Sequence, residues 1–350
     1  MSQRPTLRSV AQAAGVSTAQ VSYAFSRPDR LTPQARAHVL AVARQQGYAG
    51  PDAAARSLRT GRAGAVGVIF TVGLSYAFSD PYVMTMVAGL TEVTERHRAG
   101  LVLIPFDLSG TAGDEDAVRD SLDAVRRAVI DGAVADGLAD DHPAVLALAQ
   151  RHLPLVMSSA TAAGRCVLID DKQAGQQIGL HLATLGHRDV TVVVASYGRP
   201  GVLVPAPDEG ALFPYSRLRL DGIRAGLGHG ARVRVLSGGR NAQESGHVAG
   251  AAALDGPDLP SAIAADSDVL AGAVLHQVRL RGLEAGVDVS VTGFDDVPAA
   301  SEAGLTTVRQ PIREKGRLMG RMLLDPSYGE RRVTLPTELV VRRTTGPARR

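Results

Sequence analysis

From residue 64 onward the chain alternates short apolar runs with helical stretches, and this alternation restricts its fold more than any other feature. The runs include "GAVGVIF", "GLVLIPF", "DVTVVVA" and "VSVTGFDD", and about 10–18 residues with helical spacing separate most of them. Apolar runs joined in this way predict βαβ units whose parallel sheets are buried on both faces. The runs are too many for one ordinary sheet, so we predict an α/β body of two doubly wound, parallel-sheet lobes.

The first 48 residues carry a different pattern, which predicts three short helices. Thr6 is placed to cap the first helix and Ser17 the second, where Gln20 three residues later completes a capping box. Thr32 and Pro33 open the third helix. Two helices joined by the glycine-containing turn "AGVS" in a basic segment are typical of a helix-turn-helix.

Residues 51–60, "PDAAARSLRT", predict a helix of about two turns. An isolated helix needs about 12–15 residues to be stable in water. The segment is therefore either a linker or a helix that forms only when something stabilises it. The predicted organisation is an all-α helix-turn-helix domain over residues 1–48, a hinge helix or linker over residues 49–62, and the two-lobed body over residues 63–350.

Net charge differs between residues 1–62, called the head from here on, and the rest of the chain, the body. Residues 1–62 hold nine arginines against Asp29 and Asp52, a net charge of +7, whereas the whole chain carries +3 and the remainder therefore −4. A basic head on a mildly acidic body indicates a polyanionic partner. A basic, solvated tail is the alternative, and composition alone leaves both open. Lysine contributes little, since it occurs only at Lys172 and Lys315.

The second helix of the head has one face suited to the DNA major groove. Val21 and Phe25 are four residues apart and should face the core, which leaves small and polar side chains on the opposite side. A helix that enters the groove needs small residues to approach closely and a few longer polar groups to reach base edges. Hydroxyl groups and Arg36 would bind phosphates. The candidate DNA-binding residues of the head are Thr6, Ser17, Thr18, Ala19, Gln20, Ser22, Tyr23, Ser26, Thr32 and Arg36. An ordinary helical hairpin with a solvated face is the alternative.

Several classes of protein fit the sequence poorly. A single cysteine, Cys166, gives no disulfide framework and indicates a reducing compartment. No apolar run is long enough for a bilayer, and we expect a cytoplasmic protein without membrane contact. The sequence has no G-x-S-x-G elbow, no phosphate-binding G-x-x-x-x-G-K-[ST] loop and no H-x-x-x-H spacing. We therefore expect no enzymatic activity, no cofactor and no metal site.

The stretch "TLRSVAQAAGVSTAQVSYAFSRPDRLTPQARAHVLAVARQQGYAGPDAAARSLRTG" resembles the N-terminal region of LacI-type repressors. The body matches the same family in "LATLGHRDVTVV", "YSRLRLDGIRAGL", "DVSVTGFDD" and "LTTVRQPIREKGRLMG", in the family's order. The resemblance covers essentially the whole chain. It implies a homodimer that places two recognition helices in successive half-sites of a double-stranded operator.

The resemblance also implies roles for the linker and for two substituted positions. Leu58 matches a leucine that enters the minor groove when the hinge helix folds on DNA, and Ala55 matches the small residue one turn before it. Most members have arginine where this chain has Tyr23, so its operator should differ from the commonest one. Many have asparagine at the position of Asp52, which would cap the hinge helix here.

The two lobes resemble periplasmic sugar-binding proteins, and family members bind sugars, nucleosides or purines between the lobes. In open α/β sheets ligands bind at the carboxyl ends of the strands. Core or lobe packing is the alternative for the aromatic residues, and loop capping for Asp295. Tyr76, Phe78 and Asp80 are candidate effector-binding residues because they come after the first strand. The resemblance implies three more at the family's cleft positions, Arg219, Ser267 and Asp295.

Two hypotheses follow. The first is a DNA-binding transcriptional regulator, most simply a repressor, whose operator affinity is controlled by a small-molecule effector of the sugar or nucleoside class. The second is a cytoplasmic small-molecule-binding protein or enzyme whose N-terminal domain serves dimerisation only. The basic head and the leucine-bearing hinge favour the first. The sequence names neither the effector nor the sign of its effect on DNA binding.

Overall fold

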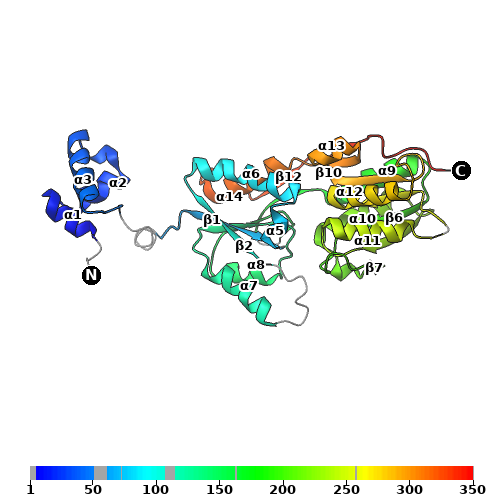
Figure 1. Cartoon of the computed structure of the whole chain (residues 1–350), viewed down its shortest axis with the longest axis horizontal. Coiled ribbons are helices and arrows are strands. Elements are labelled where there is room, and N and C mark those ends of the chain that lie inside the picture. Colours follow the sequence, from blue (N-terminus) through cyan, green and yellow to red (C-terminus); the bar gives the residue numbers. More distant parts are fainter. Residues whose placement is uncertain are drawn as a thin grey trace. The chain divides into compact units, whose positions relative to one another are not determined.

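The computed structural model describes residues 5–50, 61–71, 73–106, 115–161, 164–256 and 258–349. The chain divides into two compact units, Met1–Gly64 and Ala65–Arg350 (Figure 1). The positions Asp52, Ala55 and Leu58, to which the sequence assigns roles in the hinge, lie outside the described residues.

The first unit contains the three expected helices. Thr6 accepts a hydrogen bond from the Ser9 amide at the start of α1, and Gly15 ends that helix in the left-handed conformation at φ 64°. Ser17 and Gln20 form the capping box at α2, which confirms that prediction. The helices are α1 (Leu7–Ala14), α2 (Thr18–Ser26) and α3 (Pro33–Gln45), with a short 3-10 turn at Pro28–Arg30.

A small apolar core holds these helices together. Val10, Val21 and Val39 contribute one fully buried side chain each from α1, α2 and α3. Phe25 packs at its edge, with its ring 5.7 Å from that of Tyr48 in an edge-to-face arrangement. This packing fixes which face of α2 is turned outward.

The second unit is built on two sheets. The first has the order β12-β5-β4-β3-β1-β2, and all its neighbouring strands are parallel. Its strands are β1 (Ala65–Phe70), β2 (Gly100–Pro105), β3 (Gly132–Ala135), β4 (Leu155–Met157), β5 (Arg165–Ile169) and β12 (Arg332–Leu335).

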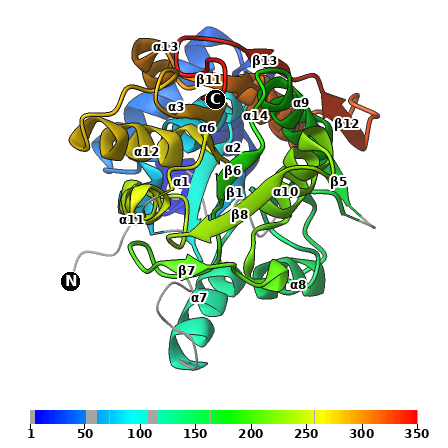
Figure 2. The same ribbon diagram turned by 90° about the vertical axis from the view of Figure 1, so that its right-hand side faces the viewer.

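The second sheet has the order β13-β11-β10-β9-β6-β8-β7, with antiparallel pairing only at its two edges. Figure 2 shows β7 beside β8 at one edge. Its strands are β6 (Asp189–Val193), β7 (Val204–Pro205), β8 (Arg232–Ser237), β9 (Ala262–Ala265), β10 (Ser290–Asp295), β11 (Thr306–Arg309) and β13 (Glu338–Val340).

Helices cover both sheets and complete two doubly wound lobes, which confirms the predicted fold class. The chain returns to the first lobe for α14 and β12. The helices of the first lobe are α5 (Leu74–Ala77), α6 (Pro81–Arg96), α7 (Glu115–Arg127), α8 (Pro143–Gln150) and α14 (Ile312–Leu324). Those of the second are α9 (Asp171–Thr184), α10 (Pro214–Leu227), α11 (Gln243–Leu254), α12 (Asp268–Leu280) and α13 (Pro298–Ala303).

The strand order locates the expected ligand site. In the first sheet β1 lies between β2 and β3, and in the second β6 lies between β8 and β9. At such a reversal of strand order the flanking connections leave toward opposite faces, which opens a crevice at the carboxyl ends of the strands. The segments that follow β1, β3, β6 and β9 therefore border the crevice of each lobe.

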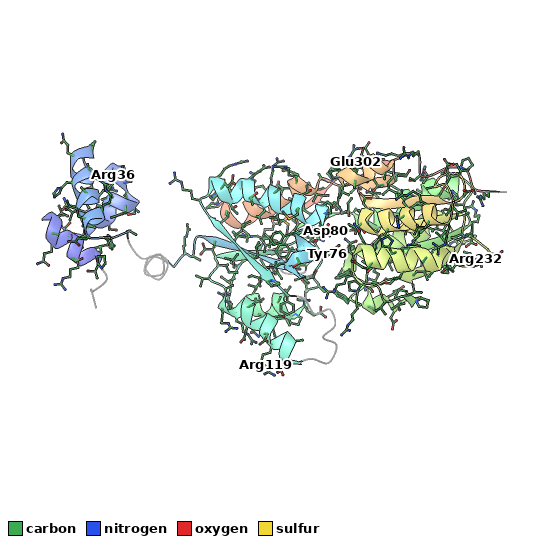
Figure 3. All side chains as sticks on the ribbon, in the orientation of Figure 1. Arg36, Tyr76, Asp80, Arg119, Arg232 and Glu302 are labelled. Atoms are coloured by element: carbon green, nitrogen blue, oxygen red, sulfur yellow. The ribbon has the colours of Figure 1, made fainter. Side chains whose placement is uncertain are left out.

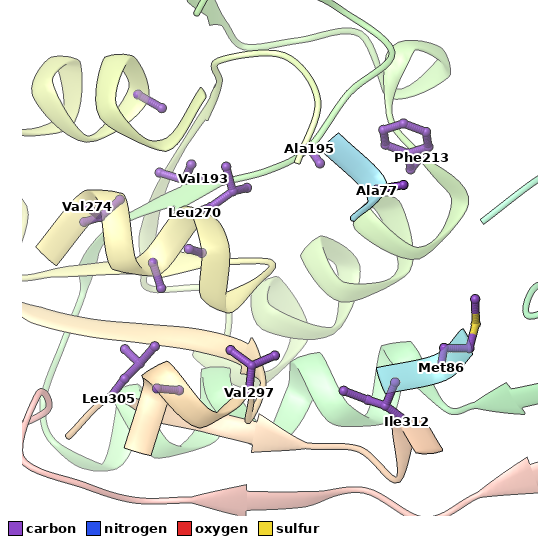
Figure 4. Packing of buried hydrophobic residues seen from close by; sticks show 14 of the residues in the cluster. Ala77, Met86, Val193, Ala195, Phe213, Leu270, Val274, Val297, Leu305 and Ile312 are labelled. Carbon is purple, nitrogen blue, oxygen red and sulfur yellow. The ribbon is translucent and has the colours of Figure 1, made fainter. Parts of the chain in front are cut away.

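An apolar cluster is shared by the two lobes. Figure 4 shows Met86 and Ile312 of the first lobe in the same cluster as Phe213, Leu270 and Val274 of the second. Each of these five side chains is almost completely buried. Across the described ranges, no helix combines the length and the apolar character that a membrane crossing requires.

Candidate functional site

The outward face of α2 carries the residues expected to contact DNA. Thr18, Ala19 and Gln20 are exposed, and Tyr23 is 38% exposed although it is one of the larger side chains of the head. Ser22 is half-buried and accepts, through its carbonyl oxygen, a hydrogen bond of 2.7 Å from the Ser26 hydroxyl. The helix thus presents small side chains at its N-terminal end and one aromatic phenol beyond them.

The hydroxyl groups of the head also stabilise its helices. Thr6, Ser17 and Thr32 each accept a backbone amide at the start of a helix. Arg36 is exposed but donates through Nε to the carbonyl oxygen of Ala24 over 3.2 Å. These four residues therefore hold the head together, and any contact with phosphates would come in addition to that role.

A cavity of about 370 Å³ lies between the two lobes, at the carboxyl ends of both sheets. Tyr76, Asp80, Arg219, Ser267 and Asp295 all line it, although they come from elements far apart in the sequence. Figure 3 labels Tyr76 and Asp80 where the first lobe faces the second. The same cavity therefore brings together five of the six candidate effector-binding residues.

Phe78 is the exception. Its side chain is 56% exposed and does not line the cavity. It follows Tyr76 by two residues at the end of the short helix α5, and residues two apart on a helix point in nearly opposite directions. Since Tyr76 faces the cavity, Phe78 faces solvent, and its assignment to the effector site is corrected.

The Pro/Gly-rich segment at residues 198–216 divides between two roles. Its last part brings Phe213 and Tyr215 to the cavity wall, where their rings stack with centroids 5.4 Å apart. Its earlier part forms β7 at the sheet edge, and Val202 there is 53% exposed. Most of the segment is therefore surface structure, and its end shapes the pocket.

Asn241 connects the two lobes at the mouth of the cavity. Its amide donates to the Asp80 carboxylate over 3.3 Å, and its backbone carbonyl accepts the phenol of Tyr76. Arg240 donates to the carbonyl oxygen of Thr71 in the first lobe.

Burial raises the pKa of Asp80 to about 6, against hydrogen bonds from the Tyr82 and Val83 amides that lower it. Asp80 therefore titrates close to neutral pH.

Ser267 supports Asn241 from the second lobe. It caps α12 by accepting the Leu270 amide, and its hydroxyl donates to the side-chain oxygen of Asn241 over 2.5 Å. Its position on the cavity wall follows from its place two residues after the end of β9. Ser267 thus orients a cavity residue that the sequence did not single out.

Arg219 forms the centre of the second lobe's wall. Its Nε donates to Asp171 over 2.8 Å and its Nη1 donates to the carbonyl oxygen of Asp266 over 2.6 Å. The guanidinium lies 3.6 Å from the centroid of the Phe294 ring and 4.8 Å from that of Tyr215. A planar cation held between aromatic rings and an aspartate has one fixed orientation toward a ligand.

Asp295 ends β10 in an unusual backbone conformation. It has φ 117° and Asp296 has φ 56°, both in the region that favours glycine. Such strain persists only where the surroundings hold it, and it is concentrated at functional sites. Asp296 is anchored by Arg309 and Arg342, while Asp295 accepts the Gln310 amide over 2.6 Å. Burial raises the pKa of Asp295 well above its ordinary value.

A second polar chain lines the wall of the first lobe. The Tyr82 phenol donates to Asp136 over 3.0 Å and accepts the ammonium of Lys315 over 3.2 Å. Lys315 also donates to the Gln310 side-chain oxygen over 3.0 Å. Through Gln310 the chain reaches Asp295, so hydrogen bonds run along the cavity from one lobe to the other.

Sequence reasoning missed several of these residues. Asp136 comes directly after β3 and Asp171 follows β5 by two residues, so the rule that selected Asp80 would also have found them. No comparable signal marks Lys315, which lies on a helix. The cavity residues added by the structure are Tyr82, Asp136, Asp171, Tyr215, Arg240, Asn241 and Lys315.

The cavity combines carboxylates, two kinds of cation, an amide and aromatic ring faces. Such a set can hold a small molecule that has several hydroxyl groups and an apolar ring face. Over the ranges that the structure covers, no group of three or more histidine, cysteine, aspartate or glutamate side chains could hold a metal ion.

Comparison with known proteins agrees with both parts of this architecture. Residues 180–345 match the family of periplasmic binding protein-like domains. An HTH-type transcriptional regulator of Mycolicibacterium smegmatis is 35% identical, over 99% of this chain and 97% of its own.

Two solved structures extend the comparison. A LacI-family transcriptional regulator from Corynebacterium glutamicum is 27% identical with a TM-score of 0.72, over 98% of this chain and 99% of its own. The transcriptional regulator CelR in complex with cellobiose is 26% identical with a TM-score of 0.66, over 97% of this chain and 100% of its own. These relatives are transcriptional regulators and not enzymes, which favours the first of the two hypotheses.

A helix-turn-helix head with an exposed α2 face precedes two lobes that enclose a polar cavity, and relatives that span nearly the whole chain are regulators of transcription. The chain belongs to the LacI family of helix-turn-helix transcriptional regulators.

Proposed function

We propose that this regulator acts in the cytoplasm as a homodimeric repressor, reads its operator with α2, and senses a polyhydroxy small molecule in the cavity between its lobes. The observation that carries the proposal is the convergence of Asp80, Arg219 and Asp295 on one cavity from both lobes. A ligand that bridges them would favour one arrangement of the lobes over the other. Differential affinity for two arrangements is all that effector control requires.

The lining favours carbohydrates as the effector class. Carboxylates and an arginine bind vicinal hydroxyl groups through charge-assisted hydrogen bonds, while Phe213 and Tyr215 offer a stacked aromatic wall for the apolar face of a sugar ring. The likeness to a regulator solved with cellobiose supports the same class. A nucleoside would use the same rings for its base, and the binding test below distinguishes the two.

On the DNA side the proposal rests on the exposed face of α2. Thr18, Ala19 and Gln20 would allow the helix to approach base edges, and Tyr23 would reach one base in each half-site. Ser22 and Ser26 on the same helix, with Thr6, Ser17, Thr32 and Arg36 around it, would contact phosphates. Ala55 and Leu58 would contribute from the hinge segment, as the family resemblance implies.

The test measures DNA binding of the full-length protein by fluorescence anisotropy on duplexes from upstream of its own reading frame. Raising the salt from about 50 to about 200 mM should weaken binding by roughly 10³-fold or more, because several phosphate contacts per dimer release counterions. Neutral and charged sugars and nucleosides are then added at fixed salt. At least one compound should change operator affinity by roughly 5- to 150-fold, the usual range of allosteric coupling.

Asp295→Asn is the matched variant, since it keeps the size of a cavity side chain and leaves the head unchanged. It should bind operator DNA like the wild type and lose the response to the effector. A compound that still released the variant would act outside the cavity, and the effector-site part of the proposal would fail while the DNA-binding part remained.

A further inference from the structure

Lys315 is a buried cation that contacts no carboxylate among the residues that the structure describes. Its side chain is on α14, in the wall of the cavity, and the residue is 3% exposed. Within the described part of the chain, its ammonium donates hydrogen bonds to two neutral groups, the Gln310 amide oxygen at 3.0 Å and the Tyr82 phenol at 3.2 Å. It forms no ion pair with any residue that the structure describes. Lysine is almost never buried to this extent without a charged partner.

The carboxylates around Lys315 are engaged elsewhere. Asp136 accepts the Tyr82 phenol, Asp171 is paired with Arg219, and Asp295 accepts the Gln310 amide. Arg219, the other buried cation in this wall, has its counter-ion in Asp171 at 2.8 Å. The two cations therefore differ: Arg219 is paired within the protein and Lys315 is not.

We propose that the effector carries an anionic group, a carboxylate or a phosphate, and that this group binds the Lys315 ammonium. The inference rests on the proposed function of the cavity as the effector site. An ammonium has three N–H donors, and the protein accepts two of them, which leaves one donor for the ligand. The effector class is thus a sugar acid or a sugar phosphate rather than a neutral sugar.

The ionisation of Lys315 agrees with this geometry. Burial lowers the pKa of Lys315, and the charge of Arg219 lowers it further. The charges of Asp136, Asp171 and Asp295 compensate only in part. A bound anion would supply the missing counter-ion. Without it, the buried charge should cost the free protein stability, because burying a charged group without a charged partner carries a large desolvation penalty.

The first experiment therefore needs no ligand. Lys315→Met in the full-length protein should raise the thermal unfolding midpoint, by about 2 °C or more, because it removes the desolvation penalty of an unpaired buried charge. Lys172→Met is the matched control: it removes the only other lysine, which is exposed on α9, and should leave the midpoint unchanged. A lower midpoint for Lys315→Met would show that Lys315 serves the fold, and the proposal would be overturned.

The second experiment compares matched ligands by titration calorimetry. The probes are glucose and galactose, glucuronate and galacturonate, and glucose 6-phosphate and galactose 1-phosphate. An anionic probe should bind at least roughly tenfold more tightly than its neutral parent, and Lys315→Met should remove that difference. The uronates and the phosphates distinguish a carboxylate effector from a phosphate effector.

The outcomes separate this inference from the proposed function. Equal or tighter binding of a neutral parent, or a preference for anions that Lys315→Met retains, would overturn the anionic effector and leave the sugar-sensing cavity intact. Failure of every anionic probe to bind at millimolar concentration would also overturn it. Binding that Asp295→Asn does not weaken would instead count against the cavity as the effector site.

Discussion

The side-chain amide of Asn241 donates to the carboxylate of Asp80 over 3.3 Å and so joins the second lobe to the first at the mouth of the cavity. Asp80 also caps α6 by accepting the Tyr82 amide over 2.9 Å. Only 4% of Asp80 is exposed. The carboxylate is therefore both a helix cap and a contact between the lobes, and it occupies a site from which water is largely excluded.

The titration of Asp80 predicts a pH-dependent contribution to stability. Its pKa rises from 3.8 to about 6 on folding, mainly through burial, so the folded state binds a proton more readily than the unfolded state. The contribution of Asp80 to the free energy of unfolding therefore grows as pH falls through 6 and is absent well above it. Between about pH 7.5 and about pH 5 the gain should be about 1 kcal/mol.

Urea unfolding of the wild type and of Asp80→Asn at the two pH values measures the contribution of Asp80 to the free energy of unfolding. The difference between the two proteins should change by that amount, because asparagine can cap α6 but does not titrate. Asp116→Asn, at an exposed aspartate of α7, is the control for the loss of a surface carboxylate. Parallel pH profiles for wild type and Asp80→Asn would mean that Asp80 is better solvated than its burial indicates.

Close packing of α9 against α10 fixes the position of Arg219. A Cβ atom added at Gly175 would overlap the backbone carbonyl of Arg219. Gly175→Ala should therefore force the helices apart and destabilise the protein by about 1–3 kcal/mol. Gly272 lies exposed within α12 with no atom near the added Cβ, so Gly272→Ala should instead stabilise by up to about 1 kcal/mol.

Thermal or urea unfolding of both glycine variants tests whether Gly175→Ala lowers the free energy of unfolding while Gly272→Ala raises it. Loss of stability in both would indicate that glycine is needed for another reason. Equal gains in both would mean that α10 can move away from α9 at little cost, in which case Arg219 would not be held as rigidly as its contacts suggest.

Most of the fold could be predicted from sequence because its strands are buried on both faces. Such strands appear as continuous apolar runs, and each run that we identified forms a strand. The two strands that were missed, β7 and β12, lie at sheet edges. Both residues of β7 are exposed, and β12 alternates between exposed and half-buried positions. Without a fully buried face neither leaves a distinctive apolar pattern.

The residues of the site also differ in whether a strand pattern in the sequence marks them. Asp80 could be selected because it follows a buried parallel strand, where the topology places ligands. Ser267 and Asp295 were selected because they match cleft positions of the family, and they too follow or end such a strand. Lys315 lies on α14 among residues with ordinary helical spacing, and only the packing of α14 against α6 brings it to the cavity. Asn241 follows the parallel strand β8 by four residues, so the strand-end rule would also have selected it.

Leu58→Ala tests whether the hinge segment contributes to operator binding. If it enters the minor groove as the family resemblance implies, Leu58→Ala should weaken operator binding by about 2–3 kcal/mol, since unstacking and bending of the base step would lose its apolar wedge. Effector binding should not change. Leu146→Ala, at a half-exposed leucine of α8, is the control. Operator affinity equal to that of the wild type would remove Leu58 from the DNA interface.

Substitution of Tyr23 tests which residue of α2 recognises a base of the operator. Its phenol is the largest group on the exposed face of α2, at a position where most family members have arginine. Arginine makes a bidentate contact with guanine that tyrosine cannot make. Tyr23→Arg should therefore bind DNA with a new preference for guanine at one position of each half-site, and bind the wild-type operator about 1–3 kcal/mol more weakly.

Selection from randomised duplexes, followed by sequencing, measures the preference of wild type, Tyr23→Arg and Tyr23→Ala side by side. The alanine variant should lose discrimination at the same position without acquiring a new one, since no side chain reaches the base. If all three proteins selected the same sequence with different affinities, Tyr23 would contact the phosphate backbone, because such contacts weaken binding uniformly across sequences. A change confined to one base pair in each half-site would instead identify Tyr23 as a residue that reads the operator.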